Sequence, residues 1–364
     1  MTPFSVERNP NPKSDEERAA ILAAPGFGKH FTDHMVRIDY ADGAWGEGRV
    51  LPYGPLTFDP ASAVFHYGQE IFEGLKAYRQ SDGSVAAFRP DANARRFARS
   101  AQRLGMAQLP AELFVESIRS LVDIDRDWVP NDPEESLYLR PFMIASEVGL
   151  GVNSPSTTYT FLTIASPAGS YFSGGIKPVK VWLSTEYTRA APGGTGEAKC
   201  GGNYAAAFVG QAQATAQGCD QVVWLDALEH RWIEEMGGMN LFFVFTDSSG
   251  AVEVVTPELS GSLLPGVTRR SLLELAAEEG ATVTERRIST EEMEKEVAAG
   301  HLTEVFACGT AAVITPVGSV KHEGGSYDIG DGTPGPMTHR LRDRLTAIQR
   351  GAAPDPRGWM QKLA

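Results

Sequence analysis

A segment rich in glycine, proline and serine divides the chain near its middle. Residues 166–178 read SPAGSYFSGGIKP, in which eight of thirteen residues are Gly, Pro or Ser. The flanking runs TTYTFLTIA (157–165) and VKVWLST (179–185) are apolar and β-branched, which predicts a strand on each side. We therefore predict a domain over 1–165 with a polar arm at 1–30, a linker loop over 166–178, and a larger domain over 179–364.

Helical and strand-like patterns follow one another along both halves. Apolar residues recur at helical spacing after Asp91, a predicted N-cap, as far as Leu104, and a second helix is predicted over 112–122. Ser289 with Glu292 three positions later predicts a capping box. The other elements predicted in the second half are helices over 205–217, 269–280 and 337–351, and strands over 221–226, 239–245, 281–288 and 304–317. This order predicts a mixed α/β fold.

Charge and cysteine content exclude several classes of protein. Lys and Arg number 33 against 46 Asp and Glu, and the net charge of −13 repels nucleic-acid phosphates and anionic lipid. The three cysteines, Cys200, Cys219 and Cys308, form no CxxC pair and no disulfide framework. The N-terminus lacks a signal-peptide core, and no run approaches the ~18 apolar residues of a membrane helix. We predict a cytoplasmic protein without nucleic-acid or membrane partners.

Several familiar motifs are incomplete in this chain. Residues 193–204, GGTGEAKCGGNY, contain glycines and a lysine, but Ala198 stands where a phosphate-binding loop needs its second glycine, and Cys200 where it needs Ser or Thr. There is no G-x-S-x-G elbow and no H-E-x-x-H pair. His230, Glu234 and Glu235 carry metal-binding side chains, yet a solvated loop histidine explains His230 better, and we predict no metal site.

Two charged residues are candidates for chemistry. Lys199 precedes Gly201 and Gly202, which allow close approach of the backbone to a ligand, and lysine forms Schiff bases with carbonyl groups. Glu235 lies 36 positions later in IEEMGGMN, just before an apolar strand. Taken alone, Lys199 also fits a solvated surface charge, and Glu235 fits a turn residue as well as a buried carboxylate facing a cofactor.

Two further segments offer backbone N–H groups to an anion. Val267 and Thr268 stand at the start of a predicted helix, where free amides and the helix dipole favour a phosphate. Gly309, Thr310 and Ala311 in CGTAAVITPVG offer further donors. An ordinary helix cap and a turn of small residues explain these segments equally well when each is taken alone.

Together the segments resemble the branched-chain amino-acid aminotransferases, which belong to the fold-type IV (class IV) pyridoxal phosphate-dependent aminotransferases. The matches run in family order from about residue 30 to the C-terminus, and FEGLKAY, KCGGNY and EEMGGMN are the most specific. The other matching segments are FRPDANARRFARSAQRL, SLYLRPFMIASEVGLGV, PAGSYFSGG, GCDQVVWLD, LLPGVTRRSLLELA and EVFACGTAAVITPV. The resemblance implies a small α/β domain and a larger, barrel-like domain that binds the cofactor.

The resemblance also implies pyridoxal 5′-phosphate as the cofactor and assigns roles to matching positions. Lys199 matches the lysine that forms the Schiff base and acts as general acid and base. Glu235 matches the carboxylate that faces the pyridine nitrogen, and Tyr204 matches the tyrosine that bonds the cofactor's phenolic oxygen. The implied phosphate-binding residues are Arg96, Val267, Thr268 and Thr310.

For the substrate, the resemblance implies an aromatic pocket with one arginine. Such a pocket can accept an apolar side chain as well as the γ-carboxylate of glutamate. Its implied members are Tyr67, Phe72, Tyr138, Arg140 and Tyr171, with Gly309, Thr310 and Ala311 offering N–H groups to the α-carboxylate. Leu150 and Val152 match residues that the family contributes across a dimer interface. Core packing is the alternative role for each aromatic residue.

The implied activity is that of a branched-chain-amino-acid transaminase. It transfers the amino group of L-leucine, L-isoleucine or L-valine to 2-oxoglutarate, by a ping-pong mechanism through Lys199. The expected partners are these small molecules, and the expected assembly is a homodimer. The alternatives of the same fold type are a D-amino-acid aminotransferase, an amine transaminase and aminodeoxychorismate lyase, and SLYLRPF with GLGV favours the branched-chain type. A non-catalytic cofactor-binding homologue is disfavoured because Lys199, Glu235, Arg96 and Tyr204 are all present.

Overall fold

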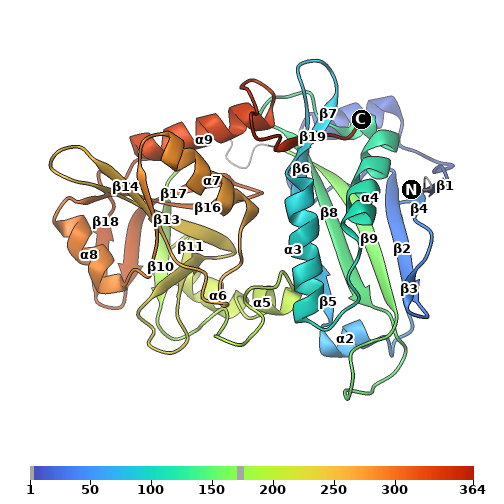
Figure 1. Cartoon of the computed structure of the whole chain (residues 1–364), viewed down its shortest axis with the longest axis horizontal. Coiled ribbons are helices and arrows are strands. Elements are labelled where there is room, and N and C mark those ends of the chain that lie inside the picture. Colours follow the sequence, from blue (N-terminus) through green and yellow to red (C-terminus); the bar gives the residue numbers. More distant parts are fainter. Residues whose placement is uncertain (1–3, 170–175) are drawn as a thin grey trace. The chain divides into compact units, whose positions relative to one another are not determined.

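The computed structural model describes residues 4–169 and 176–364, and the chain forms two compact units (Figure 1). Unit 1 comprises Met1–Tyr171, Ala198–Gly201 and Ala347–Ala364, and unit 2 comprises Phe172–Glu197 and Gly202–Thr346. Residues 170–175, within the predicted linker, lie outside the described residues, so a domain boundary at 166–178 stays a prediction. Two short segments that follow this boundary in the sequence are part of unit 1.

Unit 1 is built on one ten-stranded sheet. Its longest strands, β8 (Ser136–Ala145) and β9 (Tyr159–Ala168), are antiparallel neighbours along their whole length. The strand order is β1-β4-β2-β9-β8-β6-β7-β19, with β3 beside β2 and β5 beside β8. The other strands are β1 (Ser5–Val6), β2 (His34–Ala41), β3 (Ala44–Trp45), β4 (Arg49–Pro52), β5 (Glu70–Phe72), β6 (Leu75–Arg79), β7 (Val85–Phe88) and β19 (Met360–Lys362).

Two amphipathic helices, α3 (Pro90–Arg103) and α4 (Ala111–Ile124), cover this sheet (Figure 1). Phe97 of α3, Phe114 of α4 and Phe161 of β9 are fully buried, and their ring centroids lie 5.4 to 6.2 Å apart. Offset and edge contacts of this kind add to the free energy gained from burying the rings. The shorter helices are α1 (Asp15–Leu22), α2 (Ala63–Tyr67) and η1 (Arg126–Trp128).

Unit 2 contains a closed barrel. The strand order is β12-β11-β10-β17-β16-β13-β14-β15, and an additional pairing between β12 and β13 closes the sheet on itself. Buried aliphatic and aromatic side chains from these strands pack together in a hydrophobic core. The strands are β10 (Val179–Ser184), β11 (Gln221–Leu225), β12 (Ile233–Met236), β13 (Met239–Thr246), β14 (Val252–Thr256), β15 (Thr282–Glu285), β16 (Leu302–Gly309), β17 (Val313–His322) and β18 (Gly325–Asp328). The mixed α/β class and the barrel-like second part are confirmed.

The helices of this half are α5 (Gly201–Ala205), α6 (Phe208–Ala216), α7 (Val267–Glu278), α8 (Thr290–Ala298) and α9 (Pro336–Gln349). The single helix predicted over 205–217 is wrong in its first part. The N–H of Ala207 bonds the carbonyl of Tyr204 at 3.0 Å, and this tighter turn separates α5 from α6. No helix among the described residues is long and apolar enough to cross a bilayer.

Two other local predictions need correction. The strand predicted over 304–317 is a hairpin, because Gly309 pairs directly with Val313 and the three residues between them form the turn. Asp91 is not the N-cap of α3: the helix begins at Pro90, behind Arg89 in the left-handed region at φ 49°. Proline is well suited to the first helical position because its missing N–H is not needed there.

Helix α8 begins with half of the predicted capping box. The Ser289 side chain accepts a hydrogen bond from the Glu292 N–H at 3.1 Å, as predicted. The Glu292 carboxylate, however, pairs with Arg286 at 2.7 Å. The full box occurs instead in the predicted polar arm, where Ser14 and Glu17 cap α1.

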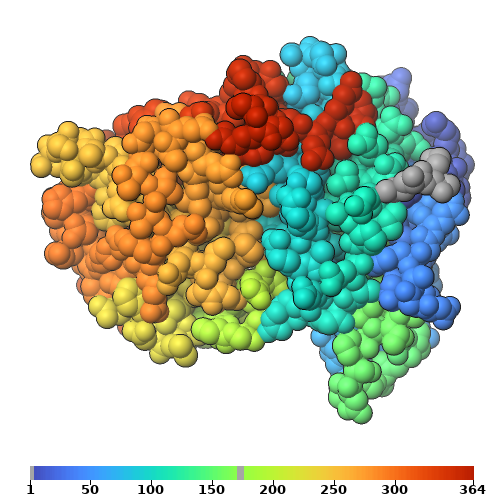
Figure 2. All heavy atoms as spheres, in the orientation of Figure 1, coloured from blue at the N-terminus to red at the C-terminus, as the bar shows by residue number. Residues whose placement is uncertain are grey.

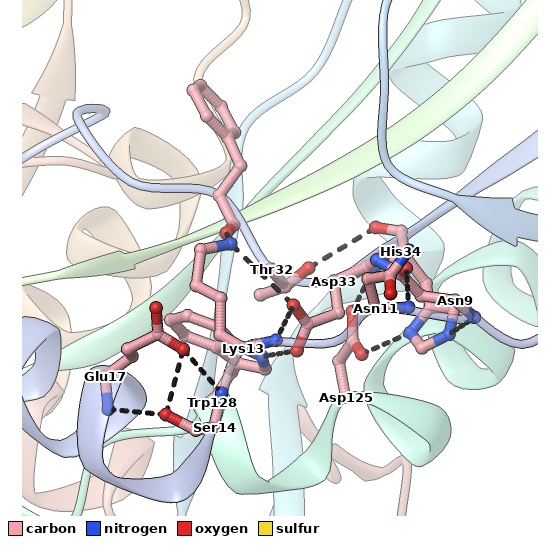
Figure 3. A network of polar contacts seen from close by, with 11 residues as sticks. Asn9, Asn11, Lys13, Ser14, Glu17, Thr32, Asp33, His34, Asp125 and Trp128 are labelled. Carbon is pink, nitrogen blue, oxygen red and sulfur yellow. Dashed lines mark hydrogen bonds and ion pairs between the residues drawn. The ribbon is translucent and has the colours of Figure 1, made fainter.

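Buried polar contacts hold this N-terminal segment onto unit 1 (Figure 3). Asp33 accepts hydrogen bonds from the Lys13 N–H at 3.0 Å and from the Trp128 indole N–H at 2.8 Å. The His34 ring accepts from the Asn9 N–H at 2.9 Å, and its other ring nitrogen lies 2.6 Å from the Asp125 carboxylate. The arm is therefore attached by hydrogen bonds to buried partners.

We expect Asp33→Ala to lower the free energy of unfolding by about 2 to 3 kcal/mol. The change leaves the buried Trp128 indole N–H without its acceptor and also frees the Lys13 N–H. Urea denaturation followed by tryptophan fluorescence measures the effect. Asp15→Ala is the control, because Asp15 is solvent-exposed and its ion pair with Arg18 lies at the surface. Equal destabilisation by both variants would contradict the assigned role of Asp33.

Candidate active site

The backbone of Lys199 is anchored inside unit 1. Its N–H donates to the Ser100 hydroxyl at 3.0 Å, and its carbonyl accepts from the Phe72 N–H at 2.9 Å. The neighbouring Ala198 and Cys200 belong to the buried core of this unit. The Lys199 Nζ lies 5.0 Å from the centroid of the Phe72 ring. Lys199 is half-buried, and its anchored backbone fixes the point from which the side chain extends.

Arg96 projects from α3 into a buried ion pair. Its Nε and Nη2 each lie 2.7 Å from one oxygen of the Glu73 carboxylate, which is fully buried. Two parallel hydrogen bonds of this kind fix the plane of a guanidinium group. Its neighbour Arg95 is exposed and pairs with Asp91 at 2.6 Å. The structure therefore distinguishes the two adjacent arginines, and Arg96 is the one oriented by a buried partner.

Three residues of the predicted substrate pocket lie against one another. The Arg140 guanidinium lies 4.8 Å from the ring centroid of Phe72 and 5.5 Å from that of Tyr138. Its Nη2 donates to the Tyr138 hydroxyl at 3.2 Å, while the buried Nε has no hydrogen-bond partner within the described part of the chain. A Cβ at Gly74 would collide with this hydroxyl. The cluster thus combines apolar ring faces with a cation.

Glu70 also lies near this cluster, and our sequence analysis overlooked it. Its carboxylate accepts a hydrogen bond from the Gly201 N–H, two residues after Lys199. Burial raises the pKa of Glu70, although this N–H and the charge of Arg140 act in the opposite direction. The carboxylate therefore links β5 to the loop that carries the lysine.

Three other predicted pocket residues of unit 1 are described by the structure, namely Tyr67, Leu150 and Val152. The Tyr67 hydroxyl donates to the Leu150 carbonyl at 2.6 Å, and Leu150 and Val152 are exposed. Tyr171 lies outside the described residues.

Glu235 of β12 is buried in unit 2 and surrounded by donors. Its Oε2 lies 2.9 Å from the Arg189 Nε. Its Oε1 accepts hydrogen bonds from the Asn240 side chain and from the Leu264 N–H, both at 3.0 Å. Because these donors come from three separate segments, the carboxylate has a single orientation. The buried-carboxylate interpretation of Glu235 therefore describes it better than the turn residue.

The other predicted cofactor residues of unit 2 lie near this carboxylate. Glu235, Asn240 and Cys308 are in register across β12, β13 and β16, and Gly309 follows Cys308 at the end of its strand. The Asn240 amide also donates to the Leu264 carbonyl at 3.0 Å, just before Gly266 and the start of α7. Glu235, the first residues of α7 and the turn at 309–311 are thus at one end of the barrel.

The start of α7 and the turn after β16 both present backbone groups. Within the described residues, no side chain caps the first turn of α7, whose N-cap is Gly266. The turn ends at Val313, which has a φ of 62°. A β-branched residue in the left-handed region costs roughly 1 to 3 kcal/mol, and such strain is common at functional sites. The antiparallel pairing of β16 with β17 holds this conformation.

Tyr204 lies at the same end of the barrel. The Tyr204 ring lies beside Gly238, where a Cβ would approach Cε1 to 3.2 Å. Gly238 belongs to the turn between β12 and β13, three residues after Glu235. Unit 2 therefore gathers the predicted residues Tyr204, Glu235, Val267 and Thr268, together with 309–311.

The turn that leads into β12 is held by Asp226. The buried Asp226 carboxylate accepts hydrogen bonds from four backbone N–H groups, those of Leu228, Glu229, Arg231 and Trp232, at 2.8 to 3.1 Å. Burial opposes ionisation, but these hydrogen bonds outweigh it and lower the pKa of Asp226 to about 2. His230 belongs to this turn and is exposed. Nowhere in residues 4–169 and 176–364 do three or more metal-binding side chains form a cluster.

Sequence reasoning overlooked Arg189, Asn240 and Glu73, which orient the predicted residues. Asn240 carried a signal, since it is the one amide at the start of the apolar run NLFFVF. Glu73 lies within the motif FEGLKAY but has no distinguishing neighbour. Arg189 lies in a short irregular segment, and nothing in the sequence connects it with Glu235.

Comparison with known families places these residues in context. Residues 70–320 match the model of the family described as amino-transferase class IV. The chain is 62% identical to the branched-chain-amino-acid aminotransferase of Mycolicibacterium smegmatis, over 99% of this chain and 98% of that protein. It is 49% identical to branched-chain-amino-acid transaminase 1 of Bacillus subtilis, over 92% of this chain and 93% of that protein.

A solved structure agrees with these matches. The branched-chain amino acid aminotransferase of Escherichia coli superposes with a TM-score of 0.73 at 27% identity, covering 91% of this chain and 99% of that one. The agreement extends over both units, since so large a share of each chain is covered.

We expect Asp226→Asn to lower the free energy of unfolding by about 2 kcal/mol at pH 7. A carboxyl group whose pKa is depressed in the folded state stabilises the protein above its unfolded value of ~3.9, and this contribution disappears as the pH falls toward 2. The difference between variant and wild type, measured by urea denaturation at several pH values, should therefore shrink between pH 4 and pH 2. The exposed Asp328→Asn is the control. A difference that is independent of pH would contradict the assignment.

Proposed function

The chain belongs to the amino-transferase class IV family, and on that premise we propose how its residues transfer amino groups between branched-chain L-amino acids and 2-oxoglutarate. It is a branched-chain-amino-acid aminotransferase that uses pyridoxal 5′-phosphate. The 62% identity to such an enzyme over 99% of the chain carries this conclusion. The relatives also disfavour the alternative activities of the same fold type and a non-catalytic homologue. The substrates are L-leucine, L-isoleucine and L-valine.

The residues present fit this cofactor. The α7 start has no side-chain cap among the described residues, whereas in the same unit α8 is capped by Ser289 and α9 by Glu304. An uncapped helix start suits a phosphate group. Glu235 offers a carboxylate that could accept the ring N–H, and Lys199 offers an amine that could condense with the aldehyde. When bound, pyridoxal phosphate supplies a carbonyl carbon that takes up the amino group and a ring that accepts electrons from the α-carbon.

We assign the proton transfer to Lys199. With the cofactor bound, the Lys199 amine would hold its aldehyde carbon and would act as the general acid and base for the substrate's α-proton. Glu235 would accept the ring N–H, and the Tyr204 hydroxyl would donate to the phenolic oxygen. The phosphate would be held by the Arg96 guanidinium, the Val267 and Thr268 N–H groups and Thr310. The support for Arg96 is its fixed orientation on Glu73.

Substrate recognition is assigned to the cluster around Arg140. Its guanidinium attracts the γ-carboxylate of glutamate, and the Phe72 and Tyr138 rings beside it accept an apolar side chain. The support for this role is the Arg140 Nε, which is buried without a partner among the described residues. The N–H groups at Gly309, Thr310 and Ala311 take the α-carboxylate, while Tyr67 and Tyr171 complete the wall.

Lys199→Ala should abolish transamination and leave the fold intact, because the variant lacks the amine that moves the α-proton. Visible absorption of the purified protein, before and after addition of L-leucine without an acceptor, provides the measurement. The wild type should be yellow and bleach, whereas the variant should not turn over. Lys180→Ala, which changes an exposed lysine on β10, is the control. Turnover by Lys199→Ala at the wild-type rate would remove Lys199 from its role, and a colourless wild type that takes up no cofactor would refute the enzyme assignment.

We also propose a homodimer in which Leu150 and Val152 reach the partner's site. The support is a set of exposed apolar side chains on unit 1, namely Phe65 (61% exposed), Val148 (60%), Leu150 (63%) and Val152 (69%). Figure 2 shows the green segment around residue 150 projecting from the surface. Apolar side chains exposed in this way are typical of a protein interface.

We further propose that the protein is located in the cytoplasm. The support is its three free cysteines, and subcellular fractionation tests this location.

Leu150→Asp combined with Val152→Asp should shift the protein from dimer to monomer. Two charges in an apolar contact lose hydration without gaining partners. Sedimentation velocity measures the mass, and activity should fall with the dimer fraction. The control is Leu228→Asp, at an exposed leucine of unit 2. A doubly substituted protein that remains dimeric at micromolar concentration would contradict the assigned interface.

A further inference from the structure

Glu235 has a limited capacity to accept hydrogen bonds, and the structure uses most of it. A carboxylate offers about four acceptor positions, two on each oxygen. Oε1 accepts from Asn240 and Leu264, so both of its positions are taken. Oε2 is bonded only to Arg189 among the described residues. The one remaining acceptor position is therefore on Oε2, the oxygen that Arg189 contacts.

Arg189 is itself held firmly in place. It is buried, and its Nη2 donates to the Ser262 carbonyl at 2.5 Å and lies 3.4 Å from the Gly196 carbonyl. A Cβ at Gly196 would collide with the Ser262 backbone, so these two loops approach each other as closely as glycine allows. The guanidinium fork thus joins two loops and the Glu235 carboxylate.

Asn240 supports the same carboxylate from its other side. Its amide bonds Glu235 Oε1 and the Leu264 carbonyl, and a Cβ at Gly266 would collide with the Asn240 Oδ1. The α7 start and the Glu235 carboxylate therefore share one support. If the cofactor binds as proposed above, the α7 start would hold its phosphate and the Glu235 carboxylate would accept its ring N–H.

We propose that Arg189 is a positioning residue that makes Glu235 Oε2 the acceptor for the cofactor's ring N–H. The inference rests on the proposed function, because it needs pyridoxal phosphate at this end of the barrel. Arg189 and Asn240 together exclude other rotations of the carboxylate. The open position on Oε2 would then be available to the ring N–H without rearrangement of the carboxylate.

The position of Arg189 has a second consequence. In a cofactor bound as proposed, Oε2 would accept the Arg189 Nε–H on one side and the ring N–H on the other. A hydrogen bond to an oxygen fixed in this way would hold the proton on the ring nitrogen. A protonated ring is the better electron acceptor, so Arg189 supports the α-proton transfer without contacting substrate or cofactor.

The test uses holoprotein reconstituted with pyridoxal phosphate labelled with ¹⁵N in the ring, in wild type, Arg189→Gln and Arg189→Lys. The ring ¹⁵N chemical shift reports protonation, and equilibrium dialysis gives the cofactor dissociation constant. Arg189→Gln should move the resonance toward that of neutral pyridine and weaken binding at least about tenfold, the effect of losing one charged hydrogen bond. Arg189→Lys keeps the charge but not the fork, so its resonance should stay near wild type while binding weakens.

Arg286→Lys is the matched control, because this half-buried arginine of unit 2 pairs with Glu292 at 2.7 Å and does not contact Glu235. It should keep the wild-type resonance and dissociation constant. A wild-type resonance and affinity in Arg189→Gln would overturn the inference. Should that variant fail to fold, wild-type affinity in Arg189→Lys would overturn it equally. A wild-type protein that binds no cofactor would instead refute the proposed function.

Discussion

Buried carboxylates that are surrounded by donors hold the irregular parts of both units in place. A carboxylate removed from water is tolerated only when hydrogen bonds replace its hydration. Asp33 attaches the N-terminal segment, and Asp226 shapes the turn before β12. Glu304 of β16 caps α9 through the N–H groups of Met337 and Thr338 at 2.9 and 2.8 Å. Glu235 is supported in the same way from three segments.

Some groups of the candidate site lack such partners. Among the described residues, the start of α7 has no side-chain cap, the buried Arg140 Nε has no acceptor, and Glu235 Oε2 keeps one open position. Each of these groups is available to a ligand without breaking a hydrogen bond within the fold. The α7 start suits a phosphate, the Arg140 Nε suits a carboxylate, and Glu235 Oε2 suits a ring N–H. These are polar groups of pyridoxal phosphate and of an amino-acid substrate.

Most of the elements that the sequence predicted lie within a few residues of the observed ones, and the errors among them have local causes. The strand predicted over 304–317 is interrupted after Gly309, and the turn there depends on Val313 in the left-handed region, a conformation that no β-branched propensity favours. Asp91 is a good capping residue, but Pro90 already begins the helix. The sequence did not predict how the polar arm is attached, because its partners Asp33 and His34 are themselves held by Trp128 and Asp125, more than 90 residues further along the chain.

The sequence by itself determined the family, and with it the barrel, the cofactor and the type of reaction, because motifs such as KCGGNY and EEMGGMN carry the residues that do the chemistry. Only the tertiary structure revealed what orients those residues. Glu73 holds Arg96, and Arg189 holds Glu235, through contacts between segments that are distant in the sequence. A side chain's type is encoded at its own position. The direction in which it points depends on hydrogen bonds from elsewhere in the fold, and those partners are defined only when the chain has folded.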